Sequence, residues 1–369
     1  MIQYKEYELK KVCSRLSSGK GIPAAQVHTK GKFPVYGGNG VRGYTDRSNF
    51  SGDCAIIGRQ GAFCGNARFF SGEAYMTEHA VVACANDENN THYLAYLLSE
   101  MNLGRLSAQS AQPGISVKTL SKQIVKLPSL AVQNKVVAVL ESFENKIALN
   151  NKINKNLEQQ AQALFQNLFV DNARPEWKQG TICDLGAVIG GSTPSKSKPE
   201  YYTDSGIAWI TPKDLSVNKS KFIYHGENDI TELGLKNSSA SIMPEGTVLF
   251  SSRAPIGYIA IAAGEVTTNQ GFKSIVPKSK IGTAFVYYFL KYNLPMIEGM
   301  ASGSTFKEIS GSVMKSVPAF VPDSETLNVF RLFCRPLFEQ QKILELQNQS
   351  LEKLRDALLP KLMNGEIEL

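Results

Sequence analysis

Three glycines near the N-terminus have the spacing of a dinucleotide-binding turn. In the segment FPVYGGNGVRGYTDRSNF (33–50), Gly38, Gly40 and Gly43 spell GxGxxG. This spacing holds a pyrophosphate only where a helix follows and supplies amide donors, and no apolar repeat of helical spacing follows Gly43. Asn39 followed by Gly40 is instead typical of a hairpin turn. We therefore expect a glycine-rich hairpin, which is either a plain tight turn or backbone that lies close to a large ligand.

Residue sets that support catalysis or metal binding are missing from the sequence. It contains no GxxxxGK[ST] phosphate loop and no Asn-Pro-Pro-aromatic element of the kind that adenine methyltransferases use. The six cysteines form no CxxC pair and do not combine with His at zinc-finger spacing. We therefore expect no catalytic residues, no metal ion and no cofactor.

Positive charge gathers in the first part of the chain. The formal net charge is +7, and residues 1–60 hold ten Lys or Arg against four Asp or Glu. This asymmetry favours an anionic partner such as nucleic acid, and a solvated basic face is the alternative. Because the start lacks an apolar signal region and no stretch reaches the length of a membrane-spanning helix, we expect a cytoplasmic protein without a membrane partner.

The chain contains two copies of one pattern, offset by about 190 residues. GDCAIIGR (52–59) matches GTVLFSSR (246–253), and YLAYLLSEMNL (93–103) matches AFVYYFLKYNL (284–294). The matches keep their order. EYELKKVC (6–13) resembles EWKQGTIC (176–183) at the smaller offset of 170, which indicates an insertion in the second copy around 195–235. A period this long is typical of a duplicated domain rather than a solenoid. The duplication predicts two similar surfaces related by an approximate two-fold axis.

Each copy has a strand-rich part followed by a long helix. Apolar residues recur at steps of three and four from Leu140 to Leu168 and again from Phe330 to Leu358, which is typical of a coiled-coil seam. Amides interrupt both predicted seams, at Asn150, Asn154, Gln340 and Gln347. Buried amides fix register and partner number; the alternative is that they lie off the seam and Ile153 faces inward.

Two prolines fall within the second helical pattern. Pro336 is expected to kink or break the helix, and Pro360 to do the same near its end. Asn364 and Gly365 then supply the stop signal.

Taken in order, these features resemble the specificity subunit of type I restriction-modification systems. In the first copy the resemblance rests on FPVYGGNGVRGY (33–44) and LPSLAVQNKVV (127–137). In the second copy it rests on GGSTPS (190–195), IAWITPKDL (207–215), NQGF (269–272), ASGST (301–305) and the tail LEKLRDALLPKLMNGEIEL (351–369). The first copy departs from the second by having SSGKGIPA (17–24) in place of GGSTPS. Base-reading residues therefore cannot be transferred from one copy to the other.

The resemblance implies a mixed α/β (α+β) fold with a pseudo-two-fold internal repeat. Two target-recognition domains, residues 1–128 and 171–322, are separated by two long antiparallel helices, residues 129–170 and 323–369, which form a coiled coil. It also implies a non-catalytic subunit that reads double-stranded DNA with a bipartite site. Two adenine methyltransferase subunits and an endonuclease subunit are the implied partners. A methyltransferase or nuclease that acts by itself is the alternative function.

Candidate DNA contacts come from the hairpin, from the GGSTPS region and from basic positions that the repeat aligns. These candidates are Asn39, Arg42, Tyr44, Arg59 and Lys118 in the first copy and Ser192, Thr193, Ser195, Lys196, Lys198, Arg253 and Lys307 in the second. Arg59 aligns with Arg253 and Lys118 with Lys307, which marks either DNA contact or stabilisation of the fold.

Candidate methyltransferase-docking residues are apolar side chains away from the predicted seam of the first helix. They are Val137, Val139, Ala148, Ile153 and Phe165. The alternative is that these residues pack against the recognition domains of the same chain.

Overall fold

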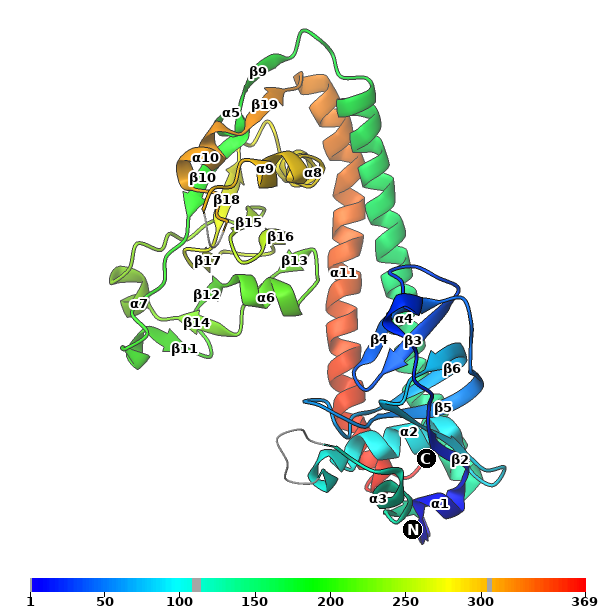
Figure 1. Cartoon of the computed structure of the whole chain (residues 1–369). Coiled ribbons are helices and arrows are strands. Elements are labelled where there is room, and N and C mark those ends of the chain that lie inside the picture. The colour runs from blue at the N-terminus through cyan, green and yellow to red at the C-terminus, as the bar shows by residue number, and fades with distance from the viewer. Residues whose placement is uncertain (1, 108–113, 304–306) are drawn as a thin grey trace. The chain divides into compact units, whose positions relative to one another are not determined.

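A computed structural model describes residues 2–107, 114–303 and 307–369 of the chain. These residues form both helices and strands, as predicted (Figure 1). The chain divides into two compact units. Unit 1 comprises Met1–Ile147 with Ser350–Leu369, and unit 2 comprises Ala148–Gln349. The long helices α4 (Leu130–Gln166) and α11 (Ser324–Met363) each contribute one end to each unit. Across the described ranges no helix is long and apolar enough to cross a membrane.

Unit 1 is built on a six-stranded sheet with the order β2-β7-β5-β6-β3-β4. The helix α2 (Thr91–Glu100) packs its apolar side chains on β5 and β7, and Asn90 caps it by accepting a hydrogen bond from the Tyr93 backbone N–H at 3.0 Å. The strands are short apolar runs bounded by turns. They are β2 (Cys13–Ser18), β3 (Phe33–Gly37), β4 (Gly40–Thr45), β5 (Phe50–Gly58), β6 (Ala67–Met76) and β7 (Ala80–Ala85).

Unit 2 contains a five-stranded sheet, β10-β18-β15-β16-β13, and a four-stranded sheet, β11-β14-β12-β17. The strands are β10 (Gly186–Gly190), β11 (Tyr202–Thr203), β12 (Ile207–Ile210), β13 (Phe222–Ile223), β14 (Asn228–Ile230), β15 (Val248–Ser252), β16 (Ile256–Ala262), β17 (Thr267–Thr268) and β18 (Lys273–Pro277). The shorter helices are α5 (Ile182–Leu185), α6 (Pro212–Val217), α7 (Glu232–Lys236), α8 (Thr283–Tyr292), α9 (Leu294–Gly299) and α10 (Gly311–Ser316). Aromatic side chains of α8 and of the long helices fill the core.

The predicted internal repeat is confirmed element by element. The two-stranded ribbon of β1 (Lys5–Glu8) and β8 (Ile124–Leu127) in unit 1 corresponds to the ribbon of β9 (Lys178–Thr181) and β19 (Pro318–Val321) in unit 2. The helices α1 (Leu9–Val12) and α3 (Val117–Ser121) correspond in the same way to α5 and α10, and α2 corresponds to α8.

The second copy carries extra elements between Pro199 and Lys236, where the first copy has the β3–β4 hairpin. These elements agree with the insertion predicted around 195–235. The second-copy motif ASGST (301–305) extends into residues 304–306, which lie outside the described residues.

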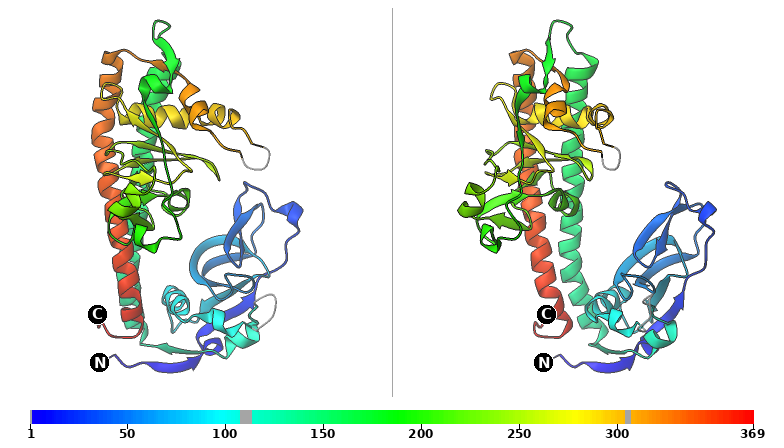
Figure 2. Two further views of the ribbon diagram at one scale, coloured as in Figure 1. Left: turned by 90° about the vertical axis from the view of Figure 1, so that its left-hand side faces the viewer. Right: turned by 60° about the vertical axis from the view of Figure 1, so that its left-hand side comes forward.

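Within unit 2, α4 and α11 run antiparallel and side by side (Figure 2). Asn150 contacts Asn348. Asn154 lies one turn further along α4 and accepts a hydrogen bond from Gln341, which lies earlier on α11. The two helices therefore run in opposite directions. The Asn150 side chain is fully buried, and its Nδ2 donates to Asn348 Oδ1 at 2.9 Å. Buried amides in the seam are therefore confirmed.

The predicted second seam is right at Phe330 and Leu344, which are buried, but its amide positions are wrong by one residue. Gln341 and Asn348 are the buried amides of α11, whereas Gln340 and Gln347 are exposed. The heptad was misread because α11 packs on α4 and on the α8 side of its own domain together, which buries more than one seam. The alternative in which Ile153 faces inward is also wrong, since Ile153 is 36% exposed.

The helix α11 continues through both prolines, so the predicted break at Pro336 is wrong. Pro336 removes the donor that would pair with the Leu332 carbonyl. Leu332 is 59% exposed, so water can supply that hydrogen bond. The predicted stop is confirmed, because α11 ends at Met363 and Gly365 has a φ of 79°.

Candidate nucleic-acid interface

The glycine-rich segment forms the β3–β4 hairpin at one edge of the unit 1 sheet (Figure 1). Gly37 pairs with Gly40, so Gly38 and Asn39 form the two-residue turn, and Gly40 has a φ of 102°. A strand follows the turn instead of a helix, which excludes a pyrophosphate cradle. The hairpin prediction is thus confirmed, with the turn one residue earlier than the Asn-Gly signal indicated.

Two glycines of the hairpin make room for two arginine side chains. A Cβ atom on Gly37 would lie 2.5 Å from Arg42 Cδ, and one on Gly40 would lie 2.6 Å from Arg68 Nη1. Arg42 is the extra residue of a β-bulge, because Val35 pairs with Gly43 and Tyr36 with Val41. The bulge and the missing Cβ atoms together let both arginines lie across the hairpin backbone.

The turn of the hairpin packs directly on the loop that follows β5. A Cβ atom on Gly58 would lie 2.4 Å from the Gly38 carbonyl oxygen, and one on Gly38 would lie 3.2 Å from the His79 carbonyl oxygen. Arg59 begins the loop; it is half-buried, and its Nη1 donates to Ser18 Oγ at 3.4 Å. Three of the predicted candidates therefore lie close together in the structure, namely Asn39, Arg42 and Arg59.

The remaining first-copy candidates lie further along their elements. Tyr44 is 38% exposed on β4, where its backbone pairs with His28 rather than with the turn. Lys118 is exposed on α3, which starts just after Ile115 donates its N–H to the Arg59 carbonyl at 2.9 Å. The segment just before α3 is thus bonded to the loop after β5.

In unit 2 the GGSTPS region packs on the NQGF motif. Thr193 Oγ1 donates to Gln270 Oε1, and the Ser192 backbone N–H donates to the Thr268 carbonyl at 2.8 Å. Ser195, Lys196 and Lys198 are exposed beyond this contact, with Lys198 Nζ 3.6 Å from Glu200 Oε1. The serine and threonine at the start of the motif therefore support the loop, and the exposed residues after it remain candidates for DNA contact.

Arg253 and Lys307 differ from the first-copy residues with which they align. Arg253 lies 3.7 Å from Glu308, which also lies 3.7 Å from Lys273. A phosphate would have to compete with this carboxylate, whereas Arg59 bonds a neutral hydroxyl. Lys307 is exposed and directly follows the residues that the structure leaves undescribed.

Two of the predicted docking residues are not at the surface. Val137 is 6% exposed in the core of unit 1, and Phe165 is 2% exposed in the aromatic core of unit 2. Val139 is half-buried against the core of unit 1. The prediction that Val137 and Phe165 offer a free surface is wrong, because the cores of unit 1 and unit 2 cover them. Ala148 and Ile153 are exposed.

Sequence reasoning missed exposed apolar residues on the long helices. In unit 2, Leu149 is 51% exposed on α4, and Val329, Leu332 and Ile343 are 51%, 59% and 49% exposed on α11. The docking residues predicted from the sequence all lie on the first helix, so the prediction does not include those of α11.

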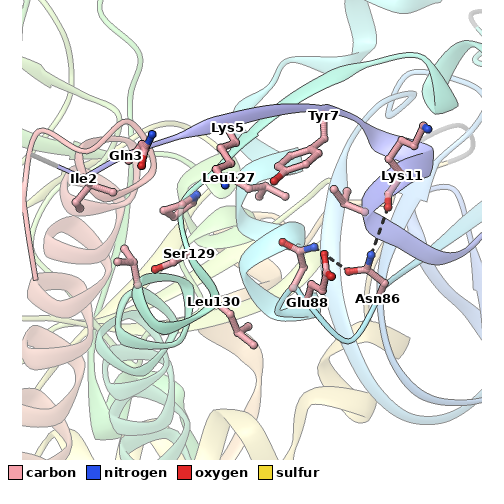
Figure 3. Close-up of a pocket in the computed structure, with 14 residues that line it drawn as sticks. Ile2, Gln3, Lys5, Tyr7, Lys11, Asn86, Glu88, Leu127, Ser129 and Leu130 are labelled. Atoms are coloured by element: carbon pink, nitrogen blue, oxygen red, sulfur yellow. Dashed lines mark hydrogen bonds between the residues drawn. The ribbon is translucent and has the colours of Figure 1, made fainter.

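A pocket of about 440 Å³ in unit 1 lies between β1 and the start of α4 (Figure 3). Lys5, Tyr7, Ser129 and Leu130 help to line it, and Asn86 closes one side by donating to the Lys11 carbonyl at 3.3 Å. Its lining, within the described part of the chain, contains none of the predicted DNA-contact residues. The hairpin surface is therefore separate from this pocket.

No group of three or more His, Cys, Asp or Glu residues in the described ranges is arranged to hold a metal ion. The hairpin surface presents amide, guanidinium and aromatic groups instead. Such groups can bind phosphates and base edges.

Comparison with known proteins identifies similar sequences and folds. The family model of the type I restriction modification DNA specificity domain matches residues 1–159 and 175–359. The type I restriction enzyme MjaIX specificity subunit of Methanocaldococcus jannaschii is 39% identical over 195 residues, which are 52% of this chain and 44% of that protein. The HindI specificity subunit of Haemophilus influenzae is 24% identical over 330 residues, 69% of this chain and 71% of that protein.

One solved structure shares the fold over nearly the whole chain. The S subunit of a type I restriction-modification system from M. genitalium superposes with a TM-score of 0.63 at 17% identity, covering 98% of this chain and 96% of that one. This similarity supports the duplicated architecture of recognition domain and long helix.

Proposed function

We propose that this chain, which belongs to the type I restriction-modification DNA specificity family, is a non-catalytic subunit that reads a bipartite site in double-stranded DNA. The observation that carries the proposal is the duplication itself: each copy joins a family domain to one long helix. Two similar recognition surfaces suit a target with two half-sites. The net charge of +7 suits a phosphate backbone.

We assign one half-site to residues 1–128 and the other to residues 171–322. The helices within 129–170 and 323–369 then act as the spacer. The competing function is a methyltransferase or nuclease that works by itself. Labelled S-adenosylmethionine offered to the isolated chain tests the methyltransferase alternative, because a specificity subunit leaves it unbound.

Exchanging residues 1–128 for the recognition domain of a relative should change one half-site and leave the other intact. The physical reason is that each domain has its own core and its own surface. The measurement is selection of bound duplexes from a random library, followed by sequencing, with the reciprocal exchange of residues 171–322 as the control. If either exchange altered both half-sites, the modular assignment would be wrong.

We further propose that two methyltransferase subunits dock on the long helices, that an endonuclease subunit joins them, and that the complex works in the cytoplasm. Leu149 and Ile343 support two equivalent docking points, because each lies nineteen residues after the start of its helix, at Leu130 and Ser324. Both are about half exposed, at 51% and 49%. Large exposed apolar side chains at repeated positions suit two copies of one partner.

Replacing Leu149 and Ile343 together with Asp should abolish the two-to-one complex, and each single variant should leave a one-to-one complex. A charge in a buried apolar contact costs several kcal/mol, which corresponds to a loss of roughly a hundred-fold or more per site. Light scattering of the mixture with the methyltransferase measures the stoichiometry. The control is Arg335→Asp, a change of charge at an exposed position of α11, the helix that carries Ile343. This variant should leave the stoichiometry unaltered. An undiminished two-to-one complex of the double variant would remove these residues from the interface.

A further inference from the structure

Phe63 is an exposed aromatic residue on the loop that the hairpin turn contacts. Its side chain is 46% exposed, and its backbone carbonyl would lie 2.6 Å from a Cβ atom on Gly58. A large apolar side chain held in water loses the free energy that burial would supply, so a partner that covers it binds more strongly.

The loop holds Phe63 in a fixed position. The Gly58 N–H donates to the Asn66 carbonyl at 2.9 Å, and the Gly65 N–H donates back to the Gly58 carbonyl at 2.8 Å. Cys64 is buried beside Phe63, and its Sγ donates to the Arg59 carbonyl at 3.2 Å. A Cβ atom on Gly65 would lie 2.2 Å from the Gly104 nitrogen, so the loop also rests on the backbone of the domain. This preorganisation lowers the entropy lost when a ligand covers the ring.

Cationic and amide side chains lie on the loop that carries Phe63 and on the hairpin that the loop contacts. Arg59 starts the same loop, exposed Gln60 follows it, and the hairpin turn that contacts the loop carries exposed Asn39. Arg42 and Arg68 lie across the two hairpin glycines. One carboxylate, that of Glu78, precedes His79 and pairs with its side chain at 3.1 Å. The balance is positive, which suits a polyanion whose interior offers an apolar contact.

Duplex DNA has this combination of properties. Its phosphates attract arginine, and its major groove exposes the thymine methyl group as the apolar base edge. We infer that Phe63 is a specificity-determining residue of the first recognition domain, which contacts a thymine methyl in one half-site while Arg42 and Arg68 bind the flanking backbone or a guanine. This inference rests on the proposed function and names the part of the surface that performs it.

The test compares Phe63→Ala with the wild-type full chain. Sites are first selected from a random duplex library, and affinities are then measured on fluorescent duplexes in which thymine is replaced by uracil one position at a time. For the wild type, one uracil in the first half-site should weaken binding roughly ten-fold, which is about 1.4 kcal/mol. For Phe63→Ala the same uracil should have no effect, and the selected second half-site should be unchanged.

Tyr7→Ala is the matched control, because Tyr7 is an exposed aromatic residue of unit 1, at 39%, on β1. It should bind like the wild type. Arg68→Lys distinguishes binding of a backbone phosphate from binding of a guanine. Lysine keeps a phosphate contact but loses the bidentate contact with guanine.

Three results would overturn the inference. Phe63→Ala could select both half-sites unchanged with full affinity, or it could weaken all duplexes equally, which would make the ring a non-specific contact. A wild-type chain without any sequence preference would overturn the proposed function as well, which distinguishes that failure from the first two.

Discussion

Replacing Lys221 with methionine should lower the free energy of unfolding of unit 2 by about 3 kcal/mol, because it removes the cation of a buried ion pair and leaves the carboxylate buried. Methionine keeps the apolar stem, so the loss reports on charge rather than on a cavity. Both tryptophans of the chain, Trp177 and Trp209, lie in unit 2, so urea titration followed by tryptophan fluorescence measures this unit.

The contacts of Lys221 explain the size of the effect. Its side chain is 6% exposed, and its Nζ lies against the Glu158 carboxylate, donates to Gln341 Oε1 at 2.8 Å and meets the Tyr288 hydroxyl at 3.1 Å. Lys221 directly precedes β13, Glu158 belongs to α4 and Gln341 to α11. The cluster therefore ties three separate parts of unit 2 to one another.

Glu158 also gives the cluster a pH dependence. Burial alone would raise the pKa of Glu158, but the positive charges of Lys221 and Lys291 outweigh it and hold that pKa at about 2. A carboxylate with a lowered folded pKa stabilises above its unfolded value of about 4.3, and this stability is lost as pH falls towards 2. Urea titrations between these pH values should show a smaller acid-induced loss for Lys221→Met than for the wild type.

Lys213→Ala is the control for the buried lysine. Lys213 pairs with Glu227 at 2.6 Å, but its side chain is 68% exposed, so its removal should change stability by less than about 1 kcal/mol. Equal effects of the two substitutions would show that burial of Lys221 does not determine the strength of its interactions.

Much of the fold could be predicted from the sequence because the chain repeats itself. A motif that recurs at a constant offset marks a domain, and steps of three and four mark a helix, without any knowledge of tertiary contacts. The side of α11 that faces inward could not be predicted in the same way. Gln341 and Asn348 are buried because two surfaces cover α11 together, and a heptad pattern describes only one of them.

The candidate site was predicted where its residues are close in sequence and missed where they are close only in space. Asn39 and Arg42 belong to one hairpin, whose turn residues identify it. Arg68 reaches that hairpin from β6, which lies beside β3 in the sheet, and the loop of Phe63 reaches it where Gly58 contacts Gly38. Both pairings depend on sheet order, which no local pattern contains. Val137 and Phe165 were misassigned for the same reason, since a domain distant in sequence covers them.

Substituting Gly58 with alanine should displace the hairpin from the loop and weaken recognition of the first half-site. The new Cβ would lie 2.4 Å from the Gly38 carbonyl oxygen and 2.6 Å from the Phe63 carbonyl oxygen, and both are backbone atoms that cannot rotate away. Overpacking of this kind costs about 1–3 kcal/mol. Hydrogen exchange of the peptides that contain β5 and residues 59–66 measures the local loss of protection.

Gly21→Ala serves as the matched control in unit 1. The nearest atom to its added Cβ is Glu78 Oε2 at 3.7 Å, an ordinary contact with a side chain. This variant should exchange like the wild type and select the same sites. For Gly58→Ala we expect faster exchange in the loop, a relaxed first half-site and an unchanged second half-site, because unit 2 has its own core. If the loop of Gly58→Ala kept its protection while the first half-site still relaxed, the glycine would act on DNA directly. The packing of the hairpin turn against the loop would then not be what positions the reading residues.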